Sequence, residues 1–345
     1  MSDFSFPLSL RVMVRASIDI RMSNQILTLL VIADPAAPFL SALSRLPQDL
    51  RLVVSDDREK LKASAPEADA ILYAHVKDTL LAEILPIAKK LRWVHCLWTG
   101  VEGIIRPELL QHPAPLTNGR GVFREPLADW VAAVMLFFSF DLRRLIRQQE
   151  RRVWKPFIGA TLNQRVLGIV GYGAIGSAAA ARARQLGMKI SALRRRTELF
   201  EGDALVDQIY ARGQLKELAR ASDYILVTAP LTPETRGLID EATIAVMKPT
   251  AVIINIGRGP VVDEVALVRA LEARKIRGAA LDVFNREPLP PDHPFWRLDN
   301  VLLSPHTADR VEGFIDPAFA CLFENLARFQ KDEPLLNLVD KQAGY

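Results

Sequence analysis

The sequence predicts an α/β protein with two doubly wound parallel-sheet domains and a cleft between them. Three observations predict this class: the chain has 345 residues, short β-branched runs alternate with helical patterns, and a glycine-rich turn separates a strand from a helix. A chain of this length is better read as two domains than as one core. Strands that alternate with helices form βαβ units, which build parallel sheets.

Two series of strands are expected along the chain. The first series lies within 26–118, and its clearest strands are ILTLLVIA (26–33), LRLVVS (50–55), ADAILYA (68–74) and LRWVHC (91–96). The second series comprises RVLGIVG (165–171), a strand that ends near Arg194, YILVTAP (224–230), AVIINIG (251–257), GAALDV (278–283) and NVLLS (300–304). Helical patterns fill the gaps between these runs, so each series predicts one parallel sheet.

The stretches between and beyond the strands define the expected domain boundaries. A long helical stretch at 126–150 joins the two series, and an apolar helix near 311–330 returns the chain to the first. We therefore assign 26–118 together with 309–345 to a flavodoxin-like substrate domain. Residues 119–308 are assigned to a Rossmann dinucleotide-binding domain, and the active site is expected in the cleft between the two.

Residues 1–25 stand apart from both domains. Arg11, Arg15 and Arg21 punctuate this acid-poor stretch before the first convincing strand. One interpretation is a transit peptide. The interpretation that we favour is a disordered extension, or a chain that begins in fact at Met22.

Composition and charge argue against several classes of partner. Forty-four basic residues against 40 acidic ones give a formal net charge of +4, which does not imply nucleic acid. The basic run at 143–155 suits the solvent-exposed face of a helix. The longest apolar run, WVAAVMLFF at 130–138, is far shorter than the roughly 20 residues of a membrane span and predicts a buried helix. We therefore expect neither a nucleic-acid nor a membrane partner.

The two cysteines indicate a reducing compartment. Cys96 and Cys321 are far apart in the sequence and cannot form a disulfide framework. No Cys and His cluster has the spacing of a metal site, so no metal is expected. These observations predict a cytoplasmic protein.

A glycine-rich turn predicts the cofactor. Gly171, Gly173 and Gly176 follow a hydrophobic strand and open an alanine-rich helix. The first glycine permits the tight turn, the second lets the backbone approach a pyrophosphate, and the third lets the helix pack closely on the strand. This context is specific for a dinucleotide such as NAD or NADP.

Arginines stand where an NAD-binding domain usually carries an acid. Arg194 and its neighbours Arg195 and Arg196 lie at the end of the next strand, where an acid would bind the ribose 2′-hydroxyl of NAD. A guanidinium offers charge and a planar set of donors to a 2′-phosphate. NADP is therefore the expected cofactor, and use of both cofactors, with a solvated basic loop, is the alternative.

Three residues near strand ends require a joint explanation: Arg258 in NIGRGP, Glu287 in DVFNREPLP and His306 in LLSPHTA. An arginine flanked by Gly257 and Gly259 has little steric shielding and can grip a carboxylate with two bonds. A histidine that a nearby carboxylate keeps protonated can donate a proton. Together the three could bind a carboxylate and supply a proton.

From about residue 26 onward the chain resembles the D-isomer-specific 2-hydroxyacid dehydrogenases, and among them the glyoxylate and hydroxypyruvate reductases. The matching stretches are GIVGYGAIGS, PLTPETRGLID (230–240), INIGRGPVVDEVALVRAL (254–271), ALDVFNREPLP (280–290) and NVLLSPHTA (300–308). The resemblance implies that Arg258 binds substrate, that Glu287 is the acid partner and that His306 is the general acid and base. It also implies cofactor contacts at Gly171, Tyr172, Gly173, Ala174, Ile175, Gly176, Arg194, Arg195, Pro230, Thr235, Ile256 and Asp282.

The first domain is expected to supply a second contact to the substrate carboxylate. Backbone N–H groups around Thr99, Gly100 and Val101, in the loop LWTGVEGI, could wrap an anion, and relatives place a similar loop there. The alternative is a plain strand-to-helix turn. Asn118 resembles a family position near the nicotinamide.

The resulting hypothesis is an NADP-preferring reductase that converts small 2-keto acids, glyoxylate and hydroxypyruvate first, to D-2-hydroxy acids. One alternative is an NAD-dependent dehydrogenase that oxidises another D-2-hydroxy acid. A second is a dinucleotide-sensing binding protein similar to the family's transcriptional corepressors. A homodimer is expected, because the helix that begins near Trp130 and the segment 154–157 carry more apolar surface than one domain requires.

Overall fold

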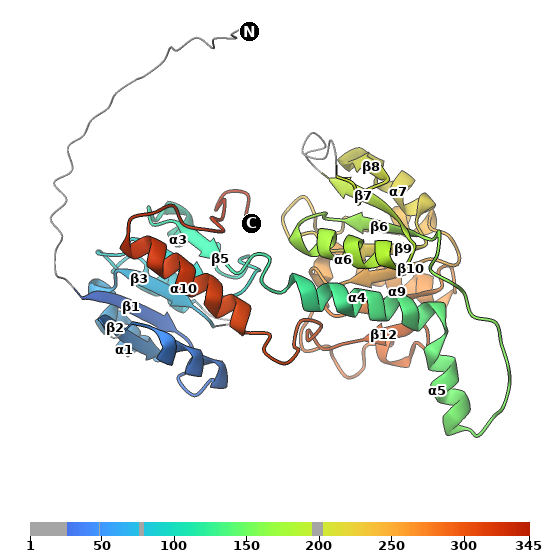
Figure 1. Cartoon of the computed structure of the whole chain (residues 1–345), viewed down its shortest axis with the longest axis horizontal. Coiled ribbons are helices and arrows are strands. Elements are labelled where there is room, and N and C mark those ends of the chain that lie inside the picture. Colours follow the sequence, from blue (N-terminus) through green and yellow to red (C-terminus); the bar gives the residue numbers. More distant parts are fainter. Residues whose placement is uncertain (1–25, 48, 76–78, 195–202) are drawn as a thin grey trace, which may run out of the picture.

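Figure 1 shows the computed structural model of the chain, which describes residues 26–47, 49–75, 79–194 and 203–345. The expected extension at 1–25 and the predicted cofactor contact Arg195 lie outside the described residues. Two separate parallel sheets, each with helices on its faces, confirm the predicted fold class. Within the described ranges, no helix combines the length and the apolar character needed to cross a bilayer.

The first domain contains a five-stranded parallel sheet with the order β2-β1-β3-β4-β5. Its strands are β1 (Leu27–Ile32), β2 (Leu50–Ser55), β3 (Ala70–Tyr73), β4 (Trp93–Cys96) and β5 (Leu116–Asn118). The helical segments between them are η1 (Pro38–Arg45), α1 (Arg58–Ser64), η2 (Ala65–Glu67), α2 (Leu80–Ile84) and α3 (Pro107–Gln111). Strand β5 was not among the predicted strands, because three residues are too few to show a pattern.

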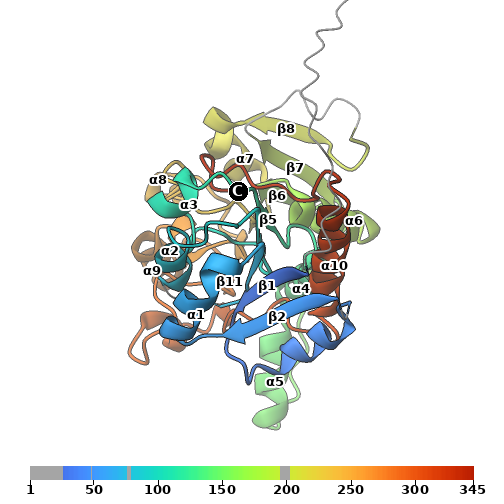
Figure 2. The same ribbon diagram turned by 90° about the vertical axis from the view of Figure 1, so that its left-hand side faces the viewer.

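Alternate residues of β1 enter two different cores. Leu29 and Val31 pack with Phe319 of α10 (Asp316–Gln330), whereas Leu30 and Ile32 pack with Leu61 of α1 on the other face. Figure 2 shows the same arrangement, with α10 on one side of the strands and α1 and α2 on the other. A strand buried on both faces reads as a continuous apolar run, which is why β1 was clear in the sequence.

The C-terminal helix α10 belongs to the first sheet, although it comes last in the chain (Figure 1). The Phe329 ring lies 5.3 Å from that of Trp93 in β4. Beyond the helix, the Val339 N–H donates to the Leu116 carbonyl at 2.9 Å. The helix begins at Asp316, five residues later than its expected start at 311, and Pro317 occupies its first turn.

The second domain contains a seven-stranded parallel sheet with the order β12-β11-β10-β9-β6-β7-β8. Its strands are β6 (Val166–Val170), β7 (Lys189–Arg194), β8 (Gln208–Ala211), β9 (Tyr224–Val227), β10 (Val252–Asn255), β11 (Gly278–Leu281) and β12 (Val301–Leu303). Its helical segments are α6 (Ala174–Gln185), η4 (Arg212–Gln214), α7 (Leu215–Ala221), α8 (Glu241–Ala245), η5 (Gly259–Val261), α9 (Glu264–Glu272) and η6 (Pro294–Arg297). The chain changes direction across the sheet between β6 and β9, which is where open α/β sheets bind ligands.

The long helical stretch expected at 126–150 is two helices, so that prediction was wrong in its continuity. Helix α4 (Arg124–Ser139) ends before Asp141, which has φ +49°, and α5 (Leu142–Glu150) follows it. Aspartate is one of the few residues that tolerate this left-handed conformation. The basic run at 143–155 is therefore helical only as far as Glu150.

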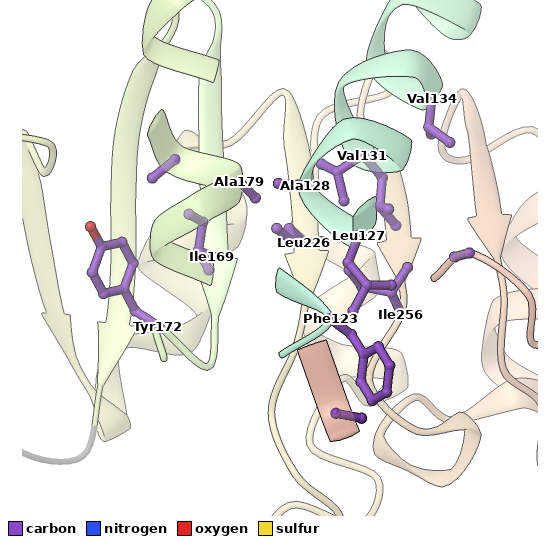
Figure 3. Close-up of a cluster of buried hydrophobic side chains, with 14 of the residues drawn as sticks. Phe123, Leu127, Ala128, Val131, Val134, Ile169, Tyr172, Ala179, Leu226 and Ile256 are labelled. Atoms are coloured by element: carbon purple, nitrogen blue, oxygen red, sulfur yellow. The ribbon is translucent and has the colours of Figure 1, made fainter. Parts of the chain in front are cut away.

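Helices α4 and α5 differ sharply in burial. Figure 3 shows Leu127, Ala128 and Val131 of α4 pointing toward Ile169 and Leu226 of the sheet, as expected for the buried helix. None of the α5 residues is buried, and Figure 1 shows α5 extending away from the domain. Two arginines of α5 fix the helix to the body: the Arg143 Nη2 group donates to the Val301 carbonyl at 2.5 Å, and Arg147 Nη1 donates to Asp299 Oδ2 at 3.3 Å.

Candidate active site

The glycine-rich turn lies between β6 and α6, and its three glycines have different surroundings. Gly171 has φ +100°, and a Cβ there would lie 2.4 Å from the Ala229 backbone nitrogen. Gly176 packs α6 onto β6, because its Cβ would lie 3.0 Å from Ile169 Cγ2. At Gly173, by contrast, a Cβ would meet no other described part of the chain within 4 Å. The turn is thus tightly packed at Gly171 and Gly176 and open at Gly173.

The start of α6 fits an anion beside Gly173. The helix begins at Ala174 with Gly173 as its N-cap, and it has neither a side-chain cap nor an acid in its first turn. The N–H groups at the start of a helix lack partners within it, and the helix dipole favours negative charge there. The open backbone and the uncapped helix therefore fit the pyrophosphate of a dinucleotide.

Strand β7 ends at Arg194, close to a tyrosine and an aspartate. The Tyr172 hydroxyl donates to Asp203 Oδ2 at 2.9 Å. Burial, followed by this hydrogen bond and the charge of Asp203, raises the pKa of Tyr172, and the charge of Arg194 acts in the opposite direction. Arg194 and Asp203 therefore both lie near Tyr172. Sequence reasoning missed Asp203, because it lies further along the chain than the strand end where such an acid is expected.

His306 and Glu287 form a hydrogen-bonded ion pair, with Nδ1 and Oε2 at 2.8 Å. The hydrogen bond that His306 donates to Glu287 is the largest influence on the histidine and, despite partial burial, raises the pKa of the imidazole. Burial pushes the pKa of Glu287 upward, but hydrogen bonds from His306 and from the Phe284 N–H outweigh it and lower that pKa. The pair therefore favours an imidazolium beside a carboxylate.

The buried carboxylate of Asp282 holds the loop that carries His306. Asp282 is 2% exposed, and its Oδ1 accepts hydrogen bonds from the Ser304 hydroxyl and from the N–H groups of Thr307 and Ala308. His306 has φ +54°, which is uncommon for any residue except glycine. Such a conformation persists only where the surrounding structure fixes it. Asp282 thus positions His306, and its expected contact with the cofactor stays a prediction.

Arg258 follows β10, and the next residue, Gly259, packs against the loop that carries Glu287. A Cβ on Gly259 would lie 2.0 Å from the Phe284 carbonyl carbon, so a side chain there would keep the two loops apart. The Phe284 N–H in turn donates to Glu287 Oε1 at 3.0 Å. The charge of Arg258 acts on both Glu287 and His306, in each case to lower the pKa. The structure therefore brings the three predicted catalytic residues together.

The same loop packs against the segment after β9 that also contacts the glycine-rich turn. A Cβ on Gly257 would lie 2.9 Å from the carbonyl oxygen of Ala229, the residue against which Gly171 packs. Asn255, which is buried, donates to the Arg258 carbonyl and accepts from the Gly257 N–H, both at 3.1 Å. The candidate cofactor and substrate sites thus share one edge of the second sheet. Asn255 was missed from sequence because a buried asparagine at a strand end has no distinctive pattern.

The loop after β4 reaches Arg258 from the first domain. Gly100 lies directly against the guanidinium, because a Cβ there would be 1.7 Å from Nη2. The Thr99 carbonyl accepts from Asn118 Nδ2 at 2.6 Å, and Val101 is buried in the first domain. Gly100 therefore faces Arg258, whereas these contacts of Thr99 and Val101 anchor the loop.

Glu102 is a site residue that sequence reasoning missed. Arg258 Nε donates to Glu102 Oε1 across the two domains, and Arg258 Nη1 donates to the Gly257 carbonyl at 2.7 Å. The two partners are 156 positions apart in the sequence. A single acid in a loop gives no sign of so distant a partner.

The remaining predicted residues have structural contacts of their own. The Thr235 hydroxyl donates to the Pro230 carbonyl at 2.6 Å and closes the turn after β9, and Ile256 is buried after β10. Their contacts with the cofactor stay predictions. Burial raises the pKa of Cys96 to about 12, which makes this thiol a poor nucleophile.

Two parallel-sheet domains, a dinucleotide turn and an Arg, Glu and His cluster beside it define a nicotinamide-dependent oxidoreductase. Residues 132–308 match the family model described as D-isomer specific 2-hydroxyacid dehydrogenase, NAD binding domain. Glyoxylate reductase from Korarchaeum cryptofilum is 36% identical over 300 residues, which cover 81% of this chain and 89% of that protein. The chain belongs to the D-isomer specific 2-hydroxyacid dehydrogenase family and is an NAD(P)-dependent 2-hydroxyacid dehydrogenase.

Solved structures agree with this assignment. A D-isomer specific 2-hydroxyacid dehydrogenase from Xanthobacter autotrophicus, in complex with NADPH and MES, is 29% identical with a TM-score of 0.79, and the match covers 93% of this chain and all of that one. The NADPH-dependent glyoxylate/hydroxypyruvate reductase from Sinorhizobium meliloti, in complex with NADP and sulfate, is 25% identical with a TM-score of 0.81. That match covers 92% of this chain and all of the other.

Proposed function

We propose that this chain is an NADP-preferring reductase of small 2-keto acids, glyoxylate and hydroxypyruvate first, and that it forms D-2-hydroxy acids. The observation that carries the proposal is the His306–Glu287 pair, 2.8 Å apart and close to the charge of Arg258. Reduction of a keto acid needs a proton for the carbonyl oxygen and a cation for the carboxylate. These three side chains supply both.

In this proposal His306 donates the proton from Nε2, because Glu287 holds the Nδ1 side of the ring. Arg258 binds the substrate carboxylate through the guanidinium edge that faces Gly100 and polarises the adjacent carbonyl. A bound nicotinamide dinucleotide supplies the hydride. Glu287 stabilises the imidazolium before the transfer, and solvent returns the proton to His306 afterwards.

The preference for NADP rests on Arg194. This arginine ends β7 near Tyr172, at the position where a positive charge would meet a 2′-phosphate. Two structural relatives were solved with NADPH or NADP. Backbone N–H groups of the turn at residues 171–176 would hold the pyrophosphate.

Asp203 favours a second candidate, an NAD-dependent dehydrogenase. Its carboxylate accepts from Tyr172 at 2.9 Å and lies near Arg194. An acid in this region can bind the ribose 2′-hydroxyl of NAD and repel a 2′-phosphate. The balance between Arg194 and Asp203 therefore decides between the two cofactors.

The function is tested by the oxidation of NADPH and NADH with glyoxylate, hydroxypyruvate, pyruvate and bulkier keto acids. Among the keto acids, we expect the highest kcat/KM with glyoxylate or hydroxypyruvate. For the cofactor, we expect a kcat/KM about tenfold or more higher with NADPH than with NADH, since one contact between a phosphate and a charged group is worth this much. Equal or better turnover with NADH would establish the second candidate. Tight NADPH binding without turnover of any keto acid would point instead to a dinucleotide-sensing protein.

We also propose a homodimer formed through α5 and the segment that follows it. In Figure 1, α5 and the segment that follows it extend from the second domain. In that segment, Trp154 is 95% exposed and Ile158 is 99% exposed. Leu145 and Ile146 of α5 are exposed as well. Apolar surface of this extent is typical of an interface. In sedimentation analysis the wild type should be a dimer, and Trp154→Ser should dissociate into monomers at a higher protein concentration. A monomeric wild type would contradict the proposal.

A further inference from the structure

The ion pair between Glu102 and Arg258 places an acid of the first domain inside the candidate substrate site. Glu102 lies on the loop after β4, and Arg258 lies on the loop after β10. Their side chains are only partly exposed, at 37% and 28%. Arg258 Nε, the donor in this contact, is one of the groups with which a guanidinium can bind a carboxylate. Glu102 thus competes for the cation on which substrate binding depends.

The second oxygen of Glu102 lies next to the part of Arg258 that remains for the substrate. The point where a Cβ on Gly100 would lie is 1.7 Å from Arg258 Nη2 and 2.8 Å from Glu102 Oε2. Both groups therefore meet at the backbone of Gly100. A keto-acid carboxylate bound to Nη2 and to the N–H groups of this loop would come close to the Glu102 carboxylate.

The charge balance of the site follows from these contacts. Arg258 and Glu102 cancel each other, and the His306–Glu287 pair is also neutral when the imidazole is protonated. One substrate carboxylate then brings these four side chains and the substrate to a single negative charge, to which the buried carboxylate of Asp282 behind His306 adds another. A second carboxylate on the substrate would add another negative charge beside side chains that are only partly exposed, where like charges repel more strongly than in bulk water.

We propose that Glu102 is a specificity-determining residue, whose carboxylate makes the site select 2-keto acids with a single negative charge and reject 2-keto dicarboxylic acids. The inference rests on the proposed function and deepens it, because it defines the substrate class. Keto acids whose side chain is uncharged, including those that carry a hydroxyl group, would be accepted.

The test compares the wild type with Glu102→Gln, which keeps a hydrogen-bond acceptor for Arg258 Nε and removes the charge. Glyoxylate and hydroxypyruvate represent the single charge, and oxaloacetate and 2-oxoglutarate represent the second carboxylate. We expect kcat/KM for the dicarboxylates to rise about tenfold or more through a lower KM, because one repulsion of like charges is removed. For the monocarboxylates we expect a change within about threefold. Glu108→Gln, at an exposed position of α3, is the matched control for the loss of one negative charge.

A ratio of dicarboxylate to monocarboxylate kcat/KM that stays within twofold of the wild-type ratio would overturn the proposal. Equal loss of activity toward both classes, in a protein with wild-type thermal stability, would also overturn it and leave Glu102 a purely structural role. If the wild type reduces no keto acid, the proposed function fails instead. Calorimetric binding of oxalate and oxamate in the presence of NADP⁺ then tests Glu102 alone, since the substitution should strengthen oxalate binding relative to oxamate, and an unchanged ratio contradicts the selectivity.

Discussion

His306 and Glu287 come from separate loops of the second domain, and the Nδ1 atom of the histidine lies 2.8 Å from Oε2 of the glutamate. This bond assigns one side of the imidazole to the carboxylate and leaves the Nε2 side for a substrate. The left-handed backbone of His306, held by Asp282, fixes the direction from which the ring approaches. The relationship therefore sets both the protonation state and the orientation of the proposed proton donor.

The first prediction concerns the pH dependence of reduction. Because Glu287 raises the pKa of His306 above its usual value of 6.5, the donor is protonated at low pH and loses its proton only above that value. We expect kcat/KM for glyoxylate to fall as pH rises through a midpoint above 6.5. In Glu287→Gln the midpoint should move downward, because the amide does not stabilise the imidazolium. The pH profile of each protein measures this, and identical midpoints would contradict the role of Glu287.

The same pair links stability to pH with a defined sign. The raised pKa of His306 means that its contribution to folding is complete below 6.5 and is lost as pH rises through the raised value. The lowered pKa of Glu287 means that its contribution is complete above 4.5 and is lost as pH falls through the lowered value. The pair should therefore stabilise the fold most between pH 4.5 and 6.5. In urea unfolding, the destabilisation caused by Glu287→Gln should be largest in this interval and smaller at pH 9.

A third prediction concerns the shape of the guanidinium at Arg258. Its three nitrogens contact Glu102, the Gly257 carbonyl and the face of Gly100, a geometry that the single ammonium of lysine does not reproduce. In Arg258→Lys we expect kcat/KM to fall about 100-fold or more, with NADPH affinity and thermal stability nearly unchanged. Arg286→Lys, at an exposed position beside Glu287, is the control. Joint loss of turnover and NADPH binding would undercut the role of Arg258.

Two glycines of the substrate loop provide a matched comparison. A methyl group on Gly100 would displace the Arg258 guanidinium, whereas one on Gly103 would meet no other described residue within 4 Å. Gly100→Ala should therefore lower kcat/KM for glyoxylate about 10- to 100-fold, since small misplacements of a binding group have effects of this size. Gly103→Ala should stay within twofold of the wild type. Similar kinetics for the two variants would show that the approach of Arg258 to Gly100 is unimportant.

The strands with continuous apolar runs were the most predictable part of the fold. Strands such as β1 and β10 are buried on both faces, and their sequences show it. The short edge strand β8 is partly exposed and was not predicted, and the break at Asp141 was missed because no glycine or proline marks it in the sequence. A single aspartate within a helical pattern does not reveal from the sequence that it will adopt a left-handed conformation and separate two helices.

The candidate site divides in the same way. Arg258, Glu287 and His306 were found because each lies in a recognisable motif at a strand end. Glu102 and Asp203 were not found, because each acquires its importance from a partner that only the fold brings near. Motifs thus revealed the residues proposed for the chemistry, and the structure added those proposed to set substrate and cofactor preference.

The last prediction separates the structural from the ligand-binding glycines of the turn. Gly171 has φ +100° and lies against the Ala229 backbone, so Gly171→Ala should destabilise the fold by about 2 kcal/mol or more. Gly173 has ordinary φ and open space for a methyl group, so Gly173→Ala should cost about 1 kcal/mol at most, as alanine is a poorer N-cap.

For cofactor binding we expect Gly173→Ala to weaken the affinity for NADPH about tenfold, because the methyl group occupies the space where the pyrophosphate approaches the backbone. Urea unfolding and calorimetric titration with NADPH measure the two effects separately. A Gly173→Ala protein that binds NADPH with wild-type affinity would show that the phosphates lie elsewhere, and the proposed cofactor site would have to be moved away from the start of α6.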